Sequence, residues 1–279
     1  ITTNSHQNNN KELTVSILKK VFPELNIVDN LDISSYYHYK EKNAEAFNYT
    51  NIYNELTNIF NNSNSNNLET MNIVLKGYFI TEKYFEIPLK CCIELTPKKN
   101  NYKEITNNFE NTYFIHIRLG DYVNHFLYNI QLVNYYNDCI NKIIVQDPLA
   151  KFIICTNEYN NHFTNYINKF PQTKNTNNNI INYIIQDKNN DAPDTLYIMK
   201  SCKGGICSNS TLSWLGAYFQ QFENDETNIN NDKNYKNKLI FMPYPWVNFV
   251  NGFTHDNIKD VYPEWAQLYD TINNKIMFI

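Results

Sequence analysis

From residue 113 onward, short apolar runs alternate with longer segments in which apolar residues recur at helical spacing. Short apolar runs are typical of buried strands, and a period near 3.6 is typical of amphipathic helices. The pattern predicts strands at 113–117, 151–155, 180–185, 205–208 and 239–242, and helices at 132–145, 162–170, 194–202 and 212–222. Strands that alternate with helices form parallel sheets with right-handed crossovers, so we expect an α/β fold that binds ligands at the carboxyl ends of its strands.

The first hundred residues carry a weaker pattern. It predicts a helix at 42–60, a short strand at 73–75 and a helix at 81–89. Residues 96–112 are polar and weakly patterned, which is typical of a boundary between domains. We therefore expect an N-terminal domain at 1–112 and a C-terminal, ligand-binding domain at 113–279.

Composition narrows the function classes. The formal net charge is −4 and the pI is about 5.9, so the chain has no general basic field that would attract nucleic acid or anionic lipid. No apolar stretch approaches the roughly 20 residues of a membrane span. The six cysteines include no C-x-x-C pair and fit neither a zinc site nor a redox pair. We expect a cytoplasmic protein, and a lost N-terminal anchor or a Golgi-type location stays open.

Asparagine, isoleucine, lysine and tyrosine are over-used, and all four have A/T-rich codons. We interpret the asparagine runs, such as 61–67 and 175–179, as polar loop filling, because such tracts bury too little apolar surface to fold.

The segment 115–122 begins in a predicted strand and ends in a loop. Alternation places His116 and Arg118 on one face. An arginine at the carboxyl end of a strand offers a planar fork that suits bidentate phosphate binding. Gly120 allows a tight turn, and Asp121 adds a carboxylate nearby. The alternative is an ordinary strand end with a surface Arg–Asp pair.

A second segment, 205–218, places four small polar residues between a strand and a helix: Ser208, Asn209, Ser210 and Thr211. Free N–H groups at a helix start, together with hydroxyl donors, form an anion site. Alternatively, Ser208, Asn209 or Ser210 caps the helix. The two interpretations are compatible.

Two further features have both a structural and a functional interpretation. Asp194 starts a predicted helix and is either its N-cap or a carboxylate that reads the edge of guanine. The segment 242–246 holds two prolines and two aromatic rings, as either a sugar platform or a packed turn. The sequence contains no Asp-x-Asp or His-x-x-x-His arrangement, so we expect no metal site.

Taken in order, these segments resemble the α-1,2-fucosyltransferase family, glycosyltransferase family 11. The family pattern His-x-Arg-Arg-Gly-Asp-Tyr is similar to 116–122, and Asn-Ser-Thr/Ser-Phe-Ser-Trp-Trp is similar to 209–215. Asp-Leu-x-Leu-Met-Ser-x-Cys is similar to 194–202, and Gly-Tyr-Phe-Gln-Ser-Glu-Lys-Tyr-Phe to 77–85. The final Pro-x-x-Trp loop resembles 243–246, and the likeness spans about 70–250.

The resemblance implies a GT-B fold, in which two Rossmann-like domains face a cleft. It implies a GDP-fucose donor, a galactose-containing glycan acceptor, and inversion at the anomeric carbon without an essential metal. By the same likeness, Arg118 grips the diphosphate, His116 lies against the nucleoside and Asp194 reads guanine. Ser210 and Thr211 hold the β-phosphate, in the loop that Ser208 and Asn209 open. Asp121 is the candidate base, because it lies close to Arg118 in the sequence.

The chain departs from the family pattern at two points. Leu119 stands where the family usually has a second arginine, and the usual N-terminal Gly-Gly-Leu-Gly-Asn-Gln segment is absent from these residues. We therefore expect the N-terminal Rossmann-like domain to lack its first strand. Three alternatives stay open: a related GDP-sugar transferase with another acceptor, a non-catalytic GDP- or glycan-binding protein, and an α/β domain whose motifs serve only capping and packing.

Overall fold

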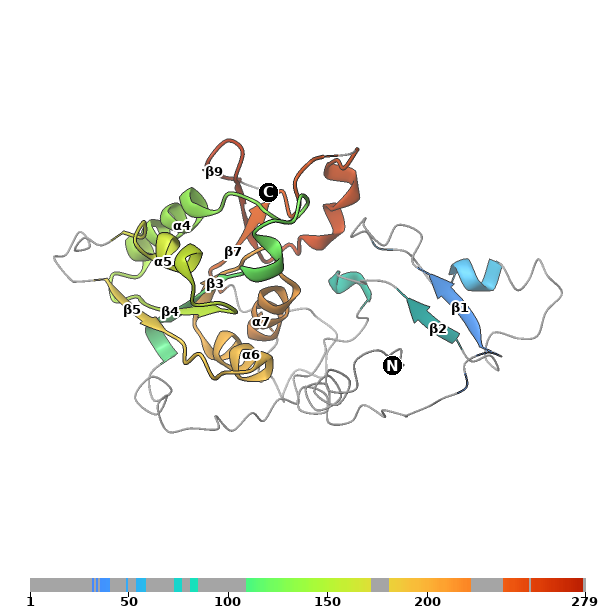
Figure 1. The fold of residues 1–279 in the computed structure, drawn as a ribbon, viewed down its shortest axis with the longest axis horizontal. Coiled ribbons are helices and arrows are strands. Elements are labelled where there is room, and N and C mark those ends of the chain that lie inside the picture. Colours follow the sequence, from blue (N-terminus) through green and yellow to red (C-terminus); the bar gives the residue numbers. More distant parts are fainter. Residues whose placement is uncertain are drawn as a thin grey trace.

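The computed structural model describes residues 32, 34, 36–40, 49, 54–58, 73–76, 81–84, 109–171, 181–221, 238–250 and 252–277. In the C-terminal part, seven strands form one sheet in the order β5-β4-β3-β6-β7-β8-β9 (Figure 1). Their bounds are β3 Thr112–Ile117, β4 Lys151–Thr156, β5 Asn182–Ile185, β6 Gly204–Ile206, β7 Ile240–Tyr244, β8 Gln267–Asp270 and β9 Lys275–Ile276. All neighbouring pairs are parallel except β8 with β9, which is antiparallel.

Helices cover both faces of this sheet. Their bounds are α4 Val133–Gln146, α5 Asn161–Ile167, α6 Ala192–Ser201 and α7 Thr211–Gln221. Side chains alternate along β3: Ile115 packs among residues of α4 and α5, while Phe114 packs among residues of α6 and α7. Since successive side chains of a strand point to opposite faces, β3 separates two hydrophobic cores.

The chain changes direction at β3. From β3 it runs outward through β4 to β5, then α6 returns it to β6 on the other side of β3. Such a reversal between neighbouring parallel strands is a topological switch point. Ligands of open α/β sheets bind there, just outside the carboxyl ends of the strands. The fold is therefore α/β with a mostly parallel sheet, as predicted, and is compatible with a Rossmann-like fold.

The described N-terminal residues include a separate two-stranded sheet. β1 (Tyr37–Lys40) and β2 (Ile73–Lys76) pair in parallel, and residues 54–58 between them are helical. The side chain of Glu55 accepts a hydrogen bond from the Tyr39 hydroxyl at 2.9 Å. At the turn Glu82–Tyr84, Glu82 accepts a hydrogen bond of 2.9 Å from the Trp265 indole, and Lys83 pairs with Asp260.

The predicted strands and helices of the C-terminal part are confirmed, with shifted ends. The helix predicted at 162–170 ends at Ile167, and the strand predicted at 205–208 covers Gly204–Ile206. The helix predicted at 81–89 is a single 3-10 turn where it is described, and 85–89 lie outside the described residues. So do most of 42–60 and of the boundary segment 96–112. Strands β8 and β9 were not predicted, because each presents too few apolar residues to show a pattern.

Gly205 allows β6 to lie close to β3. A Cβ atom added there would lie 2.3 Å from ring atoms of the fully buried Phe114. We expect Gly205→Ala to destabilise the fold by about 1–3 kcal/mol, as other overpacked cores are destabilised. Urea unfolding measures the loss, and the double variant with Phe114→Leu should lose less stability than the sum of the two single variants, because the two sites are coupled. Losses that add in full in the double variant would contradict this packing explanation.

Candidate functional site

Arg118 lies just beyond the carboxyl end of β3. Its Nη2 atom is 2.7 Å from Asp121 Oδ1, and its Cζ atom is 5.0 Å from the centre of the Tyr122 ring. The predicted Arg–Asp pair is thus present, although the side chains are 29% and 70% exposed, so solvent weakens their attraction. Arg118 Nε is buried and has no hydrogen-bond partner among the described residues. The side chain is partly exposed, so a ligand can reach the guanidinium, and a movement of the side chain is needed before Nε can donate to it.

His116 joins the two strands of the switch point. Its imidazole is buried, and Nδ1 lies 2.8 Å from the hydroxyl of Ser208, which follows β6. Its backbone carbonyl accepts a hydrogen bond of 2.7 Å from the Tyr136 hydroxyl of α4. Burial, and then the positive charge of Arg118, lower the pKa of His116 to about 3. The ring is neutral at pH 7, so it contributes hydrogen bonding rather than charge to the site.

This buried histidine predicts a loss of stability in acid. Its pKa falls from 6.5 to about 3 on folding, so the unfolded chain binds the proton more tightly. The free energy of unfolding is therefore unaffected by this group above pH 6.5. It falls by about 1.4 kcal/mol per pH unit as the pH drops from 6.5 towards 3. Urea unfolding at several pH values should show a shallower acid slope for His116→Asn than for the wild type. The exposed His162 provides the control: His162→Asn should leave the slope unchanged, and equal slopes in all three proteins would contradict the assignment.

The loop between β6 and α7 holds the other predicted donor residues. Ser208, Asn209 and Ser210 are buried, and Thr211 is exposed. The Asn209 amide nitrogen donates hydrogen bonds to the carbonyl oxygens of Tyr128 at 3.0 Å and Trp246 at 3.1 Å. These bonds make Asn209 a bridge between two other loops, a role that the sequence did not predict.

The start of α7 differs from a simple side-chain cap. The Ser213 hydroxyl donates to the carbonyl oxygens of Ser208 and Ser210, at 3.3 and 3.1 Å. The side-chain hydroxyls of Ser210 and Thr211 have no hydrogen-bond partner among the described residues. Because hydroxyls and N–H groups gather at the start of a helix, this loop retains the donors expected of an anion site.

Asp194 is not the N-cap of its helix, and this alternative is wrong. Asp191 caps α6: its Oδ1 atom accepts from the Asp194 N–H at 3.0 Å. The Asp194 carboxylate in turn accepts from the Asp191 N–H at 3.3 Å, which completes a capping box. The helix begins earlier than predicted because Asp191 is followed by Ala192 and Pro193, and proline is favoured in the first turn. Asp194 nevertheless lies beyond the carboxyl end of β5, at the same sheet edge as Arg118.

The β3–α4 loop, residues 118–132, carries Arg118 and Asp121 and is held by side-chain amides. Asn157 Oδ1 accepts from the Leu119 N–H at 2.8 Å, and its Nδ2 donates to the Leu119 carbonyl at 3.4 Å. Asn248 Nδ2 donates to the carbonyls of Phe126 at 2.9 Å and Asn129 at 3.0 Å. Sequence reasoning missed both residues. Their one signal was position, because each follows a predicted strand.

Gly120 turns this loop, as predicted. Its φ is +70°, and an added Cβ would lie 2.8 Å from Glu158 Oε1 and 2.9 Å from Asn157 Nδ2. A left-handed conformation with no room for a side chain requires glycine. Leu119, which differs from the arginine that the resemblance leads one to expect, is 3% exposed and belongs to the core on the α4 and α5 side. The side chain of Leu119 therefore packs in the core and does not offer a second charge to a ligand.

Segment 242–246 is a packed turn at Trp246. The Trp246 side chain is 2% exposed and lies in the core with α6 and α7, so the interpretation of this ring as a sugar platform is wrong. Strand β7 extends to Tyr244, and the Tyr244–Pro245 peptide bond is cis. Tyr244 is partly buried and packs against Phe249, His255 and Tyr262.

A pocket of about 360 Å³ opens beside the β3–α4 loop. Its wall is formed by that loop, by the start of α4, by Asn209 and by α5 with the residues that follow it. The volume is within the roughly 300–1,000 Å³ that small-molecule sites occupy. Of the predicted site residues, Arg118 and Asn209 line it, whereas His116, Asp121, Asp194, Ser208, Ser210 and Thr211 do not.

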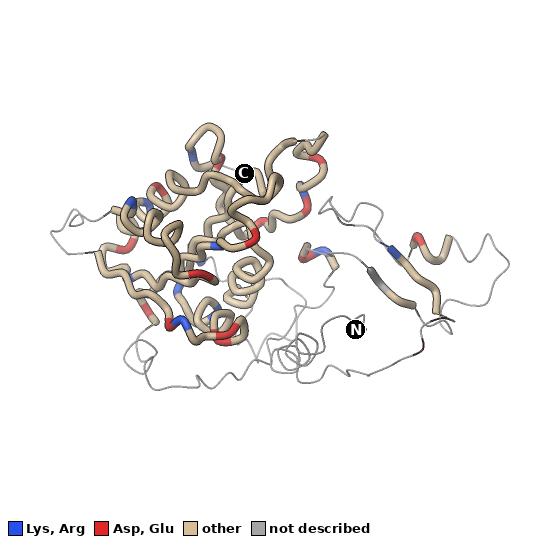
Figure 2. The backbone as a smooth tube through the Cα atoms, in the orientation of Figure 1, with Lys and Arg blue, Asp and Glu red and all other residues tan. Residues whose placement is uncertain are grey.

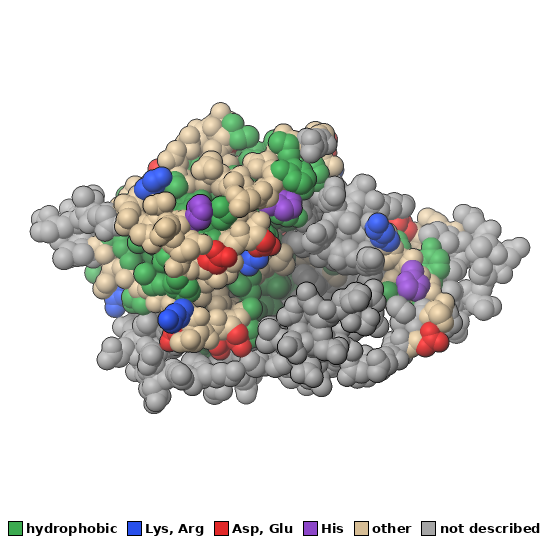
Figure 3. All heavy atoms as spheres, viewed as in Figure 1, with side chains coloured by type: hydrophobic (Ala, Val, Ile, Leu, Met, Phe, Trp, Pro, Cys, Tyr) green, Lys and Arg blue, Asp and Glu red, His purple; other side chains and the backbone are tan. Residues whose placement is uncertain are grey.

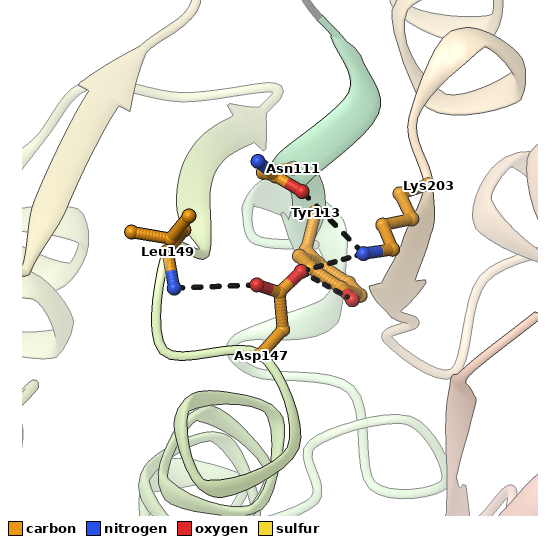
Figure 4. Close-up of polar contacts among 5 residues, drawn as sticks. All are labelled: Asn111, Tyr113, Asp147, Leu149 and Lys203. Carbon is orange, nitrogen blue, oxygen red and sulfur yellow. Dashed lines mark hydrogen bonds and ion pairs between the residues drawn. The ribbon is translucent and has the colours of Figure 1, made fainter.

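A second polar cluster lies at the opposite end of the strands, where β3 and β6 begin (Figure 4). Asp147 follows α4 and pairs with Lys203 Nζ at 2.8 Å, and it accepts from the Tyr113 hydroxyl at 3.1 Å and the Leu149 N–H at 3.2 Å. Lys203 Nζ is also 3.4 Å from Asn111 Oδ1. The cluster ties the amino ends of β3 and β6 to the end of α4, so its role is structural.

Charges of both signs are scattered along the backbone of the described residues (Figure 2). On the face drawn in Figure 3, acidic, basic and histidine side chains lie among polar and hydrophobic ones. Cys139, Cys155, Cys202 and Cys207 are free and buried. The described residues contain no group of three or more His, Cys, Asp or Glu side chains that could hold a metal ion.

Comparison with known proteins adds no relative. No family model matches the chain, and no curated protein matches it. None of the described helices combines the length and the hydropathy that crossing a membrane requires.

Proposed function

We propose that the chain is an inverting glycosyltransferase that moves fucose from GDP-fucose to the 2-hydroxyl of a galactose-type acceptor. The observation that carries the proposal is the arrangement at the switch point. The partly exposed Arg118 follows β3, its Nε has no hydrogen-bond partner among the residues that the structure describes, and the Ser208–Thr211 loop follows the neighbouring β6. A permanent cation beside the hydroxyls of a helix start suits a diphosphate, and the resemblance supplies guanosine and fucose as its two substituents.

In the proposed reaction, the acceptor hydroxyl oxygen attacks the anomeric carbon of fucose from the face opposite the diphosphate. The bond from this carbon to the diphosphate oxygen breaks, and its electron pair leaves with GDP. Arg118 and the donors of the Ser208–Thr211 loop stabilise the negative charge that develops on GDP. Asp121 takes the hydroxyl proton as the general base.

The pair of Arg118 and Asp121 connects these two roles. With no donor bound, the Asp121 carboxylate is hydrogen-bonded to Arg118 Nη2. A diphosphate competes for the same guanidinium, because it presents more charge and more acceptor oxygens. We propose that donor binding draws Arg118 towards the diphosphate and frees the exposed Asp121 carboxylate to accept the proton.

The test is the turnover of GDP-fucose with a panel of free galactosides, with and without EDTA. Acceptor-dependent release of GDP that survives EDTA is expected, and the best acceptor then identifies the product. Binding of GDP without turnover on any acceptor would favour a binding protein. If GDP does not bind at all, the proposal is wrong for this chain.

A further inference from the structure

The pocket beside the β3–α4 loop has an unusual charge for this chain. Arg118, Lys169 and His162 are part of its wall, and none of its lining residues is Asp or Glu. The whole sequence is acidic, with 28 Asp and Glu against 24 Lys and Arg. A concave wall with cations and no carboxylate favours an anionic ligand. Asp121 lies outside the pocket and neutralises part of the charge of Arg118 by pairing with it. Lys169 has no acidic partner among the described residues, so its positive charge is not offset in this way.

A helix start adds to this charge. Leu132 and Val133, at the beginning of the 14-residue helix α4, line the pocket, and no side chain caps the helix at Leu132. An α-helix carries roughly half a positive charge at its N-terminus. The helix field and the two long cations therefore favour negative charge in the same cavity.

The rest of the wall suits a sugar ring. Tyr122 and Tyr128 line the pocket and stack on each other with their ring centres 4.8 Å apart. Asn124, Gln131 and Asn165, which carry side-chain amides, line it as well. Aromatic faces with a few polar groups are typical of small-ligand sites, and amides can both donate to and accept from sugar hydroxyls.

The pocket also adjoins the proposed donor site, since Arg118 and Asn209 belong to both. We propose that it binds an acidic saccharide, one whose ring carries a carboxylate, sulfate or phosphate, with Lys169 at the charged group. The assignment of this saccharide as the acceptor rests on the proposed function. The binding of an acidic saccharide by the pocket does not depend on that function and can be tested without a donor.

The experiment titrates the full chain with matched pairs of ligands, a neutral methyl galactoside against its 6-sulfate and against the methyl glycoside of galacturonic acid with a free carboxylate, without GDP. Calorimetry or ligand-observed NMR should show about tenfold tighter binding of the charged members in the wild type. Lys169→Gln should remove most of this preference, and Lys169→Glu should reverse it. The control is Lys151→Gln, because Lys151 is exposed at the opposite end of the sheet, where β4 begins.

Several outcomes would overturn the inference. One is equal affinity for the neutral and charged ligands in the wild type. Another is a preference that both Lys169 variants retain, or that Lys151→Gln loses equally. A third is direct competition between GDP and the charged saccharide, which would make the pocket the diphosphate site. Failure of the wild type to bind GDP, with the charge preference intact, would sink the proposed function and leave the pocket assignment standing.

Discussion

Replacing Arg118 with alanine is expected to weaken GDP binding by about 1.5–3 kcal/mol or more, which corresponds to a loss of roughly 10- to 150-fold in affinity. The guanidinium is the permanent cation at the carboxyl end of β3, and within the described part of the chain its Nε has no hydrogen-bond partner. Calorimetric titration with GDP measures the loss. Unchanged affinity would place the phosphate site elsewhere.

The variant Arg118→Lys distinguishes the effect of the two parallel guanidinium donors from the effect of the positive charge. A lysine keeps one positive charge but cannot reproduce two parallel N–H donors, so it should restore only part of the affinity. Thermal unfolding of both variants provides the control for folding. The Arg118 side chain is 29% exposed, and its ion pair with Asp121 lies near solvent, so neither variant should lose much stability. A large fall in stability would mean that the weaker binding reports damage to the loop.

Much of the C-terminal fold was predictable from the sequence, because each buried element carries its own period. In α4, the buried Tyr136, Ile140 and Ile143 repeat every three or four residues, and in β3 the residues Thr112–Ile117 form one buried run. Strands β8 and β9 are short and lie at the edge of the sheet. The pairing of β8 with β7 and of β9 with β8 is a tertiary contact that leaves little trace in the local sequence.

The candidate site was predictable only in part. Strand ends indicate which residues reach the ligand edge, and His116, Arg118 and Ser208 do meet there or beside it. The hydrogen bonds of Asn157, Asn209 and Asn248 were not predictable. In a chain where asparagine is abundant, residue type does not separate a loop-holding amide from polar filling. That distinction depends on which carbonyl groups of distant loops come within reach.

Asn209→Ala is expected to destabilise the fold by about 2–4 kcal/mol. The Asn209 side chain is 2% exposed, and its amide donates to the carbonyl oxygens of Tyr128 and Trp246. Alanine removes both hydrogen bonds and leaves the Trp246 carbonyl group without that donor in a buried contact and the Tyr128 carbonyl group without it in a partly buried one. Urea unfolding measures the change in the free energy of unfolding.

Asn248 offers a matched control, since its amide also donates to two carbonyl groups of the β3–α4 loop, those of Phe126 and Asn129. These bonds are exposed, so water can replace the lost donor, and Asn248→Ala should cost only about 0.5–1.5 kcal/mol. Equal losses in the two variants would contradict the assignment of Asn209 as a buried bridge.

The same pair of variants decides what Asn209 does at the site. If Asn209 acts by holding the loop that carries Arg118, its replacement should lower stability more than it lowers the GDP affinity of the folded fraction. If it contacts the phosphate directly, the affinity should fall by more than the stability, and Asn248→Ala should leave the affinity unchanged. Because the amide nitrogen already donates two hydrogen bonds to carbonyl oxygens, we expect the first result.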